Sequence, residues 1–588
     1  MKEKAIELAK SWSTNSYFDE PDRNEILSLL KDTENNESEL IDRFYKDLEF
    51  GTGGLRSIIG MGSNRINKYN VRKAVQAMAN VVLALNPIEP KAAVSYDCRN
   101  FSIEFAKEVA SVFAANGIKT FIFSELTPTP MLSYAVRYYN CKCGVMITAS
   151  HNPKAYNGFK AYWDDGSQVT PPHDQNIIDS YAGIADWSQV KTVDFDEAQK
   201  SGMIEWIGDE VNESFYKILE SISINPQMIK DNKDVASFVY TPLHGTGYIP
   251  CKTISERLGF TNFNIIEKQS VFDGNFSTVE TTPNPEDPKA LKYAVEEMLA
   301  SNADVAYGTD PDGDRLGLVV NHKGKAQYLN GNQLAFLLIE YMFSELQKQN
   351  KLPSNPLVIK SIVTSGLQNN IVEHFGGTVL DTLTGFKWMA RLWRDLEEAD
   401  TDYNLVFASE ESFGYMTHHQ ARDKDAVGAM AMMNEVTLFY KLQGKTLVDA
   451  LDDIYTKYGY AQESLIANTY EGIAGKEKIN NIMQYFRDNS KMNIADEEVA
   501  IFSDFESQTS RDLLEGSETP IDMTKSNVLG FKFKSGNQLY LRPSGTEPKI
   551  KFYTMIKEND GDLVTKKNGA QKKIEKIEAF LHKTIDNL

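Results

Sequence analysis

Short apolar runs alternate with amphipathic segments along most of residues 70–455, and each series of runs ends in a polar loop. The first series predicts three strands, at 92–96, 119–123 and 144–148, with helices over 102–116 and near 132–139. Strands separated by helices of this length are typical of βαβ units, in which the strands run parallel and the crossovers are right-handed.

The same pattern returns twice. The second series predicts strands at 237–241, 262–267 and 303–307, with helices over 247–258 and 288–300. The third predicts strands at 357–363, 378–380 and 404–407, with helices over 366–375 and 386–397. Three such series predict three topologically similar mixed α/β domains.

The two ends of the chain differ from this pattern. Residues 1–49 read as short helices of an N-terminal arm, whereas residues 456–588 alternate helices with strand-like runs and end in a Lys-rich amphipathic helix over 565–587. A smaller α+β domain is therefore expected at the C-terminus. We predict four domains around one central cleft, over residues 1–212, 213–325, 326–455 and 456–588.

Composition narrows the possible functions. The 588 residues include 62 Lys plus Arg against 82 Asp plus Glu, a formal net charge of −20, which disfavours nucleic acid and anionic membranes as partners. The four cysteines are too few for a disulfide framework and indicate a reducing compartment. Without a signal peptide or a long apolar run, we expect a soluble cytoplasmic protein, a monomer or a homodimer.

Residues 143–160 read CGVMITASHNPKAYNGFK, and Ser150 follows a buried strand. Ligands bind beyond the carboxyl ends of parallel strands, so Ser150 is well placed for chemistry. A serine nucleophile needs a base or a metal, and His151 and Lys160 are the nearby candidates, each also able to meet an anionic phosphate. For a lone Ser-His pair, an ordinary polar turn is the alternative.

The segment DPDGDR places Asp310, Asp312 and Asp314 on one tight turn, which offers the oxygen ligands that Mg²⁺ or Ca²⁺ requires. An EF-hand would need glycine and glutamate where Arg315 and Asn321 stand, so that interpretation fails. A solvated acidic turn remains an alternative. Three carboxylates repel one another unless a cation lies between them, which favours a metal site.

Two further loops carry candidate chemistry. Glu410, Glu411 and Ser412 follow an apolar strand. The two carboxylates could act as a general acid/base pair, hold sugar hydroxyls or simply be solvated. The other loop, LRPSGTEPK, offers a guanidinium, two hydroxyls and backbone N–H groups, which suit a phosphate dianion, although an ordinary hairpin turn is the alternative. Its donors are Arg542, Ser544, Gly545 and Thr546.

In this order the loops resemble the α-D-phosphohexomutases, the phosphoglucomutase and phosphomannomutase superfamily, and the N-terminal arm and GTGGLR resemble its longer, phosphopentomutase-containing branch. YDCRNFS, TLTGFKWM and RDKDAV match further family segments. Two departures stand out: Ser409 replaces the glycine of the usual G-E-E-S, and Gln420 stands where longer relatives have a histidine.

The resemblance implies a role for each loop. Ser150 would carry the phosphoryl group and, with the three aspartates, hold Mg²⁺. Arg542, Ser544, Gly545 and Thr546 would clamp the phosphate that is not transferred. The sugar ring would be held by Glu410 and Ser412, with Thr384, Gly385 and Lys387 as further contacts. The cleft arginines would be Arg56, Arg99 and Arg315, with Arg56 counted among the catalytic residues and Arg99 and Arg315 among the substrate-binding residues.

We therefore predict a phosphohexomutase that interconverts glucose 1-phosphate and glucose 6-phosphate, with glucose 1,6-bisphosphate as intermediate and activator. Lys160 is the first candidate for proton transfer and His151 the second. A phosphomannomutase, a phosphopentomutase or a sugar-bisphosphate synthase would share these loops. A non-catalytic scaffold that binds sugar phosphates is a more distant alternative, because neither the serine nor an aspartate is missing.

Overall fold

The computed structural model describes residues 2–51, 53–470, 472–544 and 549–588. By packing, the chain divides into two compact units, each considered separately below. Unit 1 comprises residues 1–330, 386–401 and 412–446, and unit 2 comprises residues 331–385, 402–411 and 447–588. The predicted division into four domains remains a prediction.

Unit 1 begins with the expected helical arm. Its helices are α1 (Lys2–Thr14), α2 (Glu20–Leu30) and α3 (Glu37–Phe44). The arm has an aromatic core of its own, in which Trp12 stacks on Phe18 at 4.4 Å and meets Phe44 and Trp187 edge-on. Burial of these rings fixes three short helices that would be marginal in isolation.

The first sheet of unit 1 is mixed, with strand order β1-β5-β4-β2-β3-β6. Its strands are β1 (Gly54–Ile58), β2 (Lys91–Tyr96), β3 (Lys119–Phe123), β4 (Cys143–Ile147), β5 (Tyr156–Trp163) and β6 (Ile204–Ile207). The predicted strands β2, β3 and β4 pair in parallel, as expected. β5, which the sequence did not predict, runs antiparallel between β1 and β4.

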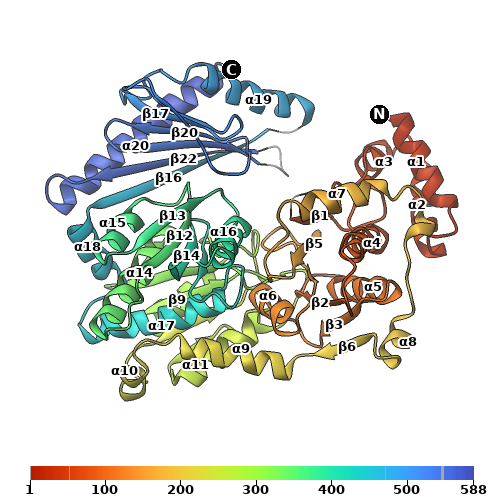
Figure 1. The fold of residues 1–588 in the computed structure, drawn as a ribbon, viewed down its shortest axis with the longest axis horizontal. Coiled ribbons are helices and arrows are strands. Elements are labelled where there is room, and N and C mark those ends of the chain that lie inside the picture. Colours follow the sequence, from red (N-terminus) through yellow and green to blue (C-terminus); the bar gives the residue numbers. More distant parts are fainter. Residues whose placement is uncertain (1, 52, 471, 545–548) are drawn as a thin grey trace. The chain divides into compact units, whose positions relative to one another are not determined.

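Helices cover both faces of this sheet (Figure 1). On one side pack α4 (Lys68–Ala84), α5 (Ser102–Ala115) and α7 (His173–Gly183), and on the other α6 (Thr129–Tyr138) and α9 (Asp209–Ser221). All five residues of β4 are buried, because a strand enclosed on both faces needs no polar side. β4 therefore carries no charged residue, and the polar residues follow in the loop beyond it.

The second sheet of unit 1 has the order β11-β10-β9-β7-β8. Its strands are β7 (Phe238–Thr241), β8 (Phe263–Ile265), β9 (Val305–Thr309), β10 (Leu316–His322) and β11 (Lys325–Leu329). β7 is parallel to β8 and β9, whereas β9, β10 and β11 form an antiparallel meander. Around it lie α11 (Tyr248–Leu258), α13 (Lys292–Ala300) and the almost wholly buried α17 (Ala426–Leu442).

Unit 2 contains strands of the third sheet, in which β12 (Pro356–Ser361) pairs in parallel with β13 (Thr378–Thr382) and β14 (Asn404–Glu410). The helices α14 (Gly331–Lys348), α15 (Leu367–His374) and α18 (Leu447–Tyr458) belong to the same unit. The third predicted βαβαβ series is thus confirmed in its strands. Its last helix, α16 (Phe386–Glu398), packs as part of unit 1.

The rest of unit 2 is a seven-stranded antiparallel sheet of order β16-β22-β21-β20-β17-β18-β19. Its strands are β16 (Tyr460–Thr469), β17 (Val499–Asp504), β18 (Thr509–Asp512), β19 (Glu518–Pro520), β20 (Leu529–Phe533), β21 (Gln538–Pro543) and β22 (Lys549–Glu558). One face packs against α19 (Gly472–Asp488) and α20 (Leu563–Asp586), which confirms the predicted C-terminal α+β domain (Figure 1).

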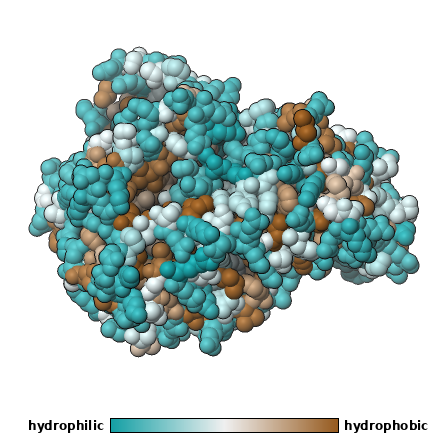
Figure 2. All heavy atoms as spheres, turned by 60° about the horizontal axis from the view of Figure 1, so that its bottom comes forward, coloured by the Kyte–Doolittle hydropathy of each residue, from teal (hydrophilic) through white to brown (hydrophobic). Residues whose placement is uncertain are grey.

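On the face drawn in Figure 2, hydrophilic residues prevail and hydrophobic ones form scattered groups. Among the described residues, no helix is both long enough and apolar enough to cross a membrane.

The inserted strand β5 depends on a glycine. A Cβ atom at Gly158 would lie 2.6 Å from Thr148 O and 2.7 Å from Leu55 O, both backbone atoms of neighbouring segments. We predict that Gly158→Ala lowers the free energy of unfolding by about 2 kcal/mol, because the sheet must open to admit the methyl group. Urea unfolding measures this, with Gly183→Ala as the control, since nothing lies within 4 Å of that Cβ position. Equal stability of the two variants would contradict this packing of β5.

Candidate functional site

Ser150 lies just beyond the carboxyl end of β4, with its side chain buried. Its backbone has a φ of 51°, a left-handed conformation that costs a non-glycine residue free energy. Ser150 Oγ donates a hydrogen bond to Asp310 Oδ2 at 2.7 Å and lies 3.2 Å from His151 Nδ1. The serine loop and the aspartate loop of unit 1 therefore meet at the serine hydroxyl.

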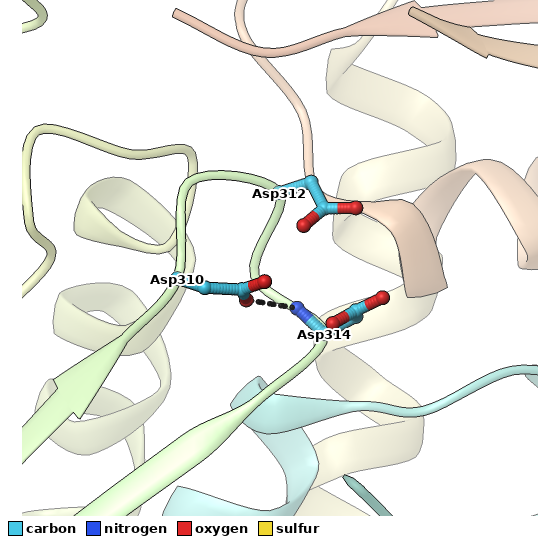
Figure 3. A group of neighbouring side chains, drawn as sticks. All are labelled: Asp310, Asp312 and Asp314. Carbon is cyan, nitrogen blue, oxygen red and sulfur yellow. Dashed lines mark hydrogen bonds between the residues drawn. The ribbon is translucent and has the colours of Figure 1, made fainter. Parts of the chain in front are cut away.

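Asp310, Asp312 and Asp314 occupy the turn between β9 and β10, and Figure 3 shows their carboxyl groups gathered around one space. One oxygen from each lies within 4.8 Å of the others, and all three residues are buried. The backbone N–H groups of Asp314 and Arg315 hold Asp310 Oδ1 at 3.1 and 3.0 Å. Asp312 Oδ1 and Asp314 Oδ1 are buried without a hydrogen-bond partner in the described structure. Orphaned hard oxygen donors of this kind fit a divalent cation.

Two lysines oppose the charge of these aspartates. Lys160, from β5, lies 2.5 Å from Asp312 Oδ2 and 3.1 Å from Asp314 Oδ2, and Lys424 lies 3.3 Å from Asp314 Oδ2. Burial opposes ionisation of Asp314, but Lys160 and Lys424 outweigh it and lower its pKa. Burial also disfavours the charged form of Lys160, but Asp312 and Asp314 raise the pKa of this lysine. The ion pairs therefore keep Lys160 protonated.

Asp310 and His151 differ from their neighbours in charge. Burial, reinforced by Asp314 and Asp312, raises the pKa of Asp310 well above its ordinary value. Burial, reinforced by Arg315 and Arg56, lowers the pKa of His151 well below its ordinary value, so its imidazole is neutral at pH 7. A neutral imidazole next to Ser150 Oγ can accept a proton, which a protonated lysine cannot.

The three predicted cleft arginines occupy different environments. Arg56, on β1, is exposed and donates to Asn152 Oδ1 at 3.3 Å, while Arg315 pairs with Glu286. Arg99 is buried beneath the serine loop. Arg56 and Arg315 both act electrostatically on His151, which places them near Ser150.

Lys387 belongs to α16 and lies in unit 1. Its ammonium nitrogen is 3.8 Å from Asp174, and burial, only partly offset by this carboxylate, lowers the pKa of Lys387 to about 8. In the same unit, Asp423 accepts hydrogen bonds from Tyr162 and Gln168 at 2.7 and 2.9 Å.

In unit 2 the predicted sugar-binding loop follows β14. Glu410 Oε1 accepts a hydrogen bond from the Gly385 N–H at 2.6 Å, which joins this loop to the TLTGFKWM segment. Thr384 Oγ1 is buried and has no hydrogen-bond partner among the described residues. The unusual Ser409 is fully buried and exchanges hydrogen bonds with Gln368 at 3.0 and 3.1 Å, so its side chain has its own polar partner.

Glu411 is held differently. It accepts from Ser361 at 3.1 Å and from Thr364 at 3.2 Å, and burial together with Glu410 raises its pKa. Ser412, predicted to contact the sugar with Glu410, is partly buried directly after this loop.

Arg542 is the penultimate residue of β21, opposite Lys551 on β22, and Ser544 directly follows the strand. The predicted phosphate-binding residues Gly545 and Thr546 lie outside the described residues. Leu541 and Phe552, the adjacent pair, belong to the core beneath α19 and α20, so Arg542 and Lys551 project from the opposite face of the sheet.

Within unit 2, Arg542 of the predicted phosphate-binding loop lies near the predicted sugar-binding loop. Both Arg542 and Glu411 act electrostatically on the hydroxyl of Tyr553, and Lys551 acts on Glu411. No role was predicted from the sequence for Lys551 or Tyr553. Their alternation along β22, with polar residues on one side and core residues on the other, was the available signal.

Lys424 and Asp423 were also missed as individual residues, although the segment RDKDAV that contains them was recognised. His418 lies two residues before Gln420, which stands where longer relatives have a histidine. His418 is buried and its Nε2 lies 2.9 Å from Asp425, which caps α17. That contact gives His418 a structural partner.

Comparison with known proteins gives a consistent result. Three family models match this chain, those of phosphoglucomutase/phosphomannomutase α/β/α domains I, II and III, over residues 47–186, 214–324 and 330–458. A phosphoglucomutase of Staphylococcus epidermidis is 35% identical over 544 residues, which cover 92% of this chain and 96% of that protein. A phosphoglucomutase of Staphylococcus aureus is 36% identical over 547 residues, with the same two shares.

Solved structures agree in fold. Parafusin of Paramecium, a phosphoglucomutase in its open form, has a TM-score of 0.65 at 18% identity and covers 91% of this chain and 95% of its own. A putative phosphomannomutase of Thermus thermophilus has a TM-score of 0.64 at 17% identity, covering 91% of this chain and 99% of its own. At these identities the likeness concerns the fold alone.

The aspartate loop generates a direct prediction. We expect Asp314→Asn to weaken Mg²⁺ binding by about 100-fold, because it replaces one of the three carboxyl groups of the loop with a neutral amide. Isothermal titration of chelator-treated protein measures the dissociation constant. Asp231→Asn, at an exposed aspartate on α10 (Pro226–Asp231), is the control and should bind as the wild type does. Equal affinity in all three proteins would exclude this loop as the metal site.

Proposed function

Because this chain belongs to the phosphoglucomutase/phosphomannomutase family, we propose that it interconverts glucose 1-phosphate and glucose 6-phosphate through a phosphoserine at Ser150. The enzyme class, a phosphohexomutase, follows from the family and confirms the prediction from sequence. The observation that carries the proposal is the buried Ser150 hydroxyl, which lies 2.7 Å from Asp310 of the aspartate loop and beside the neutral His151.

The transfer would proceed in two steps. Phosphorylated Ser150 gives its phosphoryl group to the free hydroxyl of a glucose monophosphate. The bond from phosphorus to Ser150 Oγ breaks and a bond to the sugar oxygen forms, while the sugar hydroxyl proton passes to a base and Ser150 Oγ takes up a proton to become a hydroxyl. The resulting glucose 1,6-bisphosphate reorients and returns its other phosphoryl group to Ser150. The same bisphosphate would therefore charge an unphosphorylated chain, which makes it an activator as well as an intermediate.

Lys160 and His151 would have different roles in proton transfer. Lys160, protonated through its contacts with Asp312 and Asp314, can donate a proton or stabilise negative charge. Neutral His151 can accept one. Asp310 would orient the Ser150 hydroxyl when the serine carries no phosphate, as its hydrogen bond supports.

We propose that Asp310, Asp312, Asp314 and an oxygen on Ser150 hold Mg²⁺. When bound, this ion would neutralise charge on the transferring phosphoryl group. The donor set fits it, because two carboxylate oxygens of the loop are buried without partners in the described structure.

Residues of each unit are proposed to contact substrate. Glu410, Ser412, Thr384, Gly385 and Lys387 are proposed to contact the sugar, in line with the Glu410–Gly385 hydrogen bond that joins two of these segments. The phosphate not in transfer is proposed to bind to Arg542, Ser544, Gly545 and Thr546, and the exposed guanidinium of Arg56 and that of Arg315 would meet the group in transfer. Local positive charge would thereby offset the net charge of −20.

Several properties stay proposals beside this one. The same groups would serve a phosphomannomutase, a phosphopentomutase or a sugar-bisphosphate synthase, so the sugar must be determined by assay. A cytoplasmic location and a monomeric or dimeric state also stay predictions.

The test is a comparison of substrates. With Mg²⁺ and a trace of glucose 1,6-bisphosphate, we predict the highest kcat/KM for glucose 1-phosphate among glucose, mannose and ribose 1-phosphates. Ser150→Ala should lose turnover on the order of 10⁴-fold or more, because the group that carries the phosphoryl is removed. Ser221→Ala, at an exposed serine of α9, is the control and should match the wild type. Full activity of Ser150→Ala would refute the mechanism, and a preference for another sugar would refute the substrate.

A further inference from the structure

We propose that Arg99 is a positioning residue of the serine loop, acting through the backbone of Ser150 and making no contact with substrate. Resemblance to the phosphohexomutases implied that Arg99 binds substrate. Its environment supports another role. This inference rests on the proposed function, since its effect is on phosphoryl transfer at Ser150.

The guanidinium group of Arg99 binds four backbone carbonyl groups of one loop. Its Nη2 donates to Ser150 O and Asn152 O, both at 2.5 Å. Its Nη1 donates to Pro153 O at 3.0 Å and to Tyr156 O at 2.9 Å. The planar fork of an arginine can serve several acceptors at once, and here they span the whole loop from the serine to the first residue of β5.

No donor of this side chain is accessible to a substrate, although its buried Nε has no hydrogen-bond partner in the described structure. Its exposed fraction is 0%, its Nε lies 3.4 Å from Asp97 Oδ2, and the Phe276 ring lies 5.0 Å from its central carbon. A phosphate could reach the guanidinium only by displacing the loop that carries Ser150. A ligand arginine of a phosphate site, by contrast, keeps donors directed at the ligand.

Asp97 holds the same loop from the other side. Its Oδ2 accepts a hydrogen bond from Thr148 Oγ1 at 2.6 Å, and Thr148 Oγ1 in turn accepts from the Ser150 N–H at 2.8 Å. Its Oδ1 accepts from Ser102 and from the Arg99 N–H. The N–H and the C=O of Ser150 are therefore both clamped, one through Thr148 and Asp97, the other by Arg99.

This double clamp accounts for the backbone of Ser150. A serine at a φ of 51° persists only where the surroundings fix it. The clamped conformation aims Oγ at Asp310, so loosening it would misplace the reacting oxygen. A misplacement of about 1 Å at a reacting centre can cost about 100-fold in rate.

The positioning role and a substrate-binding role make opposite predictions. For Arg99→Lys, which keeps the charge but loses the fork, we expect kcat to fall about 100-fold with KM within about threefold of the wild type. Hydrogen–deuterium exchange of the peptide spanning residues 148–156 should rise at the same time. Both are measured on the holoenzyme with Mg²⁺, with kcat referred to the folded fraction from thermal melting.

Two further variants make the test decisive. Arg72→Gln is the matched control: Arg72 is a partly buried arginine of unit 1 in a bidentate pair with Glu108 at 2.6 and 2.9 Å, so its loss should reduce stability and leave kcat and loop exchange unchanged. Thr148→Val removes the clamp on the Ser150 N–H without changing side-chain shape, and should give the same fall in kcat and the same rise in loop exchange. It replaces Arg99→Lys in the test if the Arg99→Lys protein folds poorly.

The possible results distinguish a positioning role of Arg99 from a substrate-binding role. A KM about tenfold higher with kcat little changed would make Arg99 a substrate ligand and overturn the proposal. Unchanged kcat and unchanged loop exchange in Arg99→Lys and Thr148→Val would overturn it as well. If the wild type itself shows no mutase turnover, the proposed function fails, and loop exchange alone then decides whether Arg99 fixes the Ser150 backbone.

Discussion

The structure of unit 1 depends on the need to bury three carboxylates on one turn. Asp310, Asp312 and Asp314 repel one another, and each loses the solvation that water would give its charge. Lys160 and Lys424 offset part of that cost with direct ion pairs. Each lysine comes from a different part of the chain, so this one electrostatic requirement ties the first sheet to the second.

The insertion of β5 meets this requirement. A strand antiparallel to β4 returns the chain alongside the serine loop, and Lys160 lies opposite Met146 of β4 and Gly54 of β1. The residue that neutralises the aspartates therefore stands on the strand that follows Ser150. Unsatisfied oxygens remain on Asp312 and Asp314, so the lysines leave part of the charge for a cation. Partial neutralisation is what a metal-dependent phosphoryl transfer needs, because full ion pairing would remove the affinity for the metal.

Sequence alone predicted most of the strands that deliver functional loops. The bounds of β3 match the structure, and β2, β4 and β12 differ by a few residues, because buried parallel strands flanked by helices give a strong signal. β5 escaped prediction because YNGFKAYW mixes aromatic, polar and small residues without the alternation of a half-buried strand. The β10–β11 hairpin was missed behind the more conspicuous aspartate loop.

For the candidate site, residue types were predictable and environments were not. The motif containing Arg99 placed it near Ser150, but only the structure reveals that its donors end on four carbonyl groups. Likewise, nothing in the sequence indicates that Lys160 is held protonated while His151 is neutral, since both states arise from burial and from charges distant in the chain. Alternation along β22 indicates which face Tyr553 occupies, but its proximity to Arg542 depends on the pairing of β22 with β21, which no local pattern encodes.

Phosphoryl transfer through Ser150 is the central claim. The fraction of Ser150 that carries a phosphoryl group is the measurement that tests it most directly. Dephosphorylated protein is incubated with Mg²⁺ and glucose 1,6-bisphosphate, and peptides are mapped by mass spectrometry before and after addition of excess glucose 1-phosphate. The account predicts a phosphoryl group on Ser150 that appears with the bisphosphate and is discharged by the monophosphate. Mutase turnover without any phosphoryl group on Ser150 would contradict it.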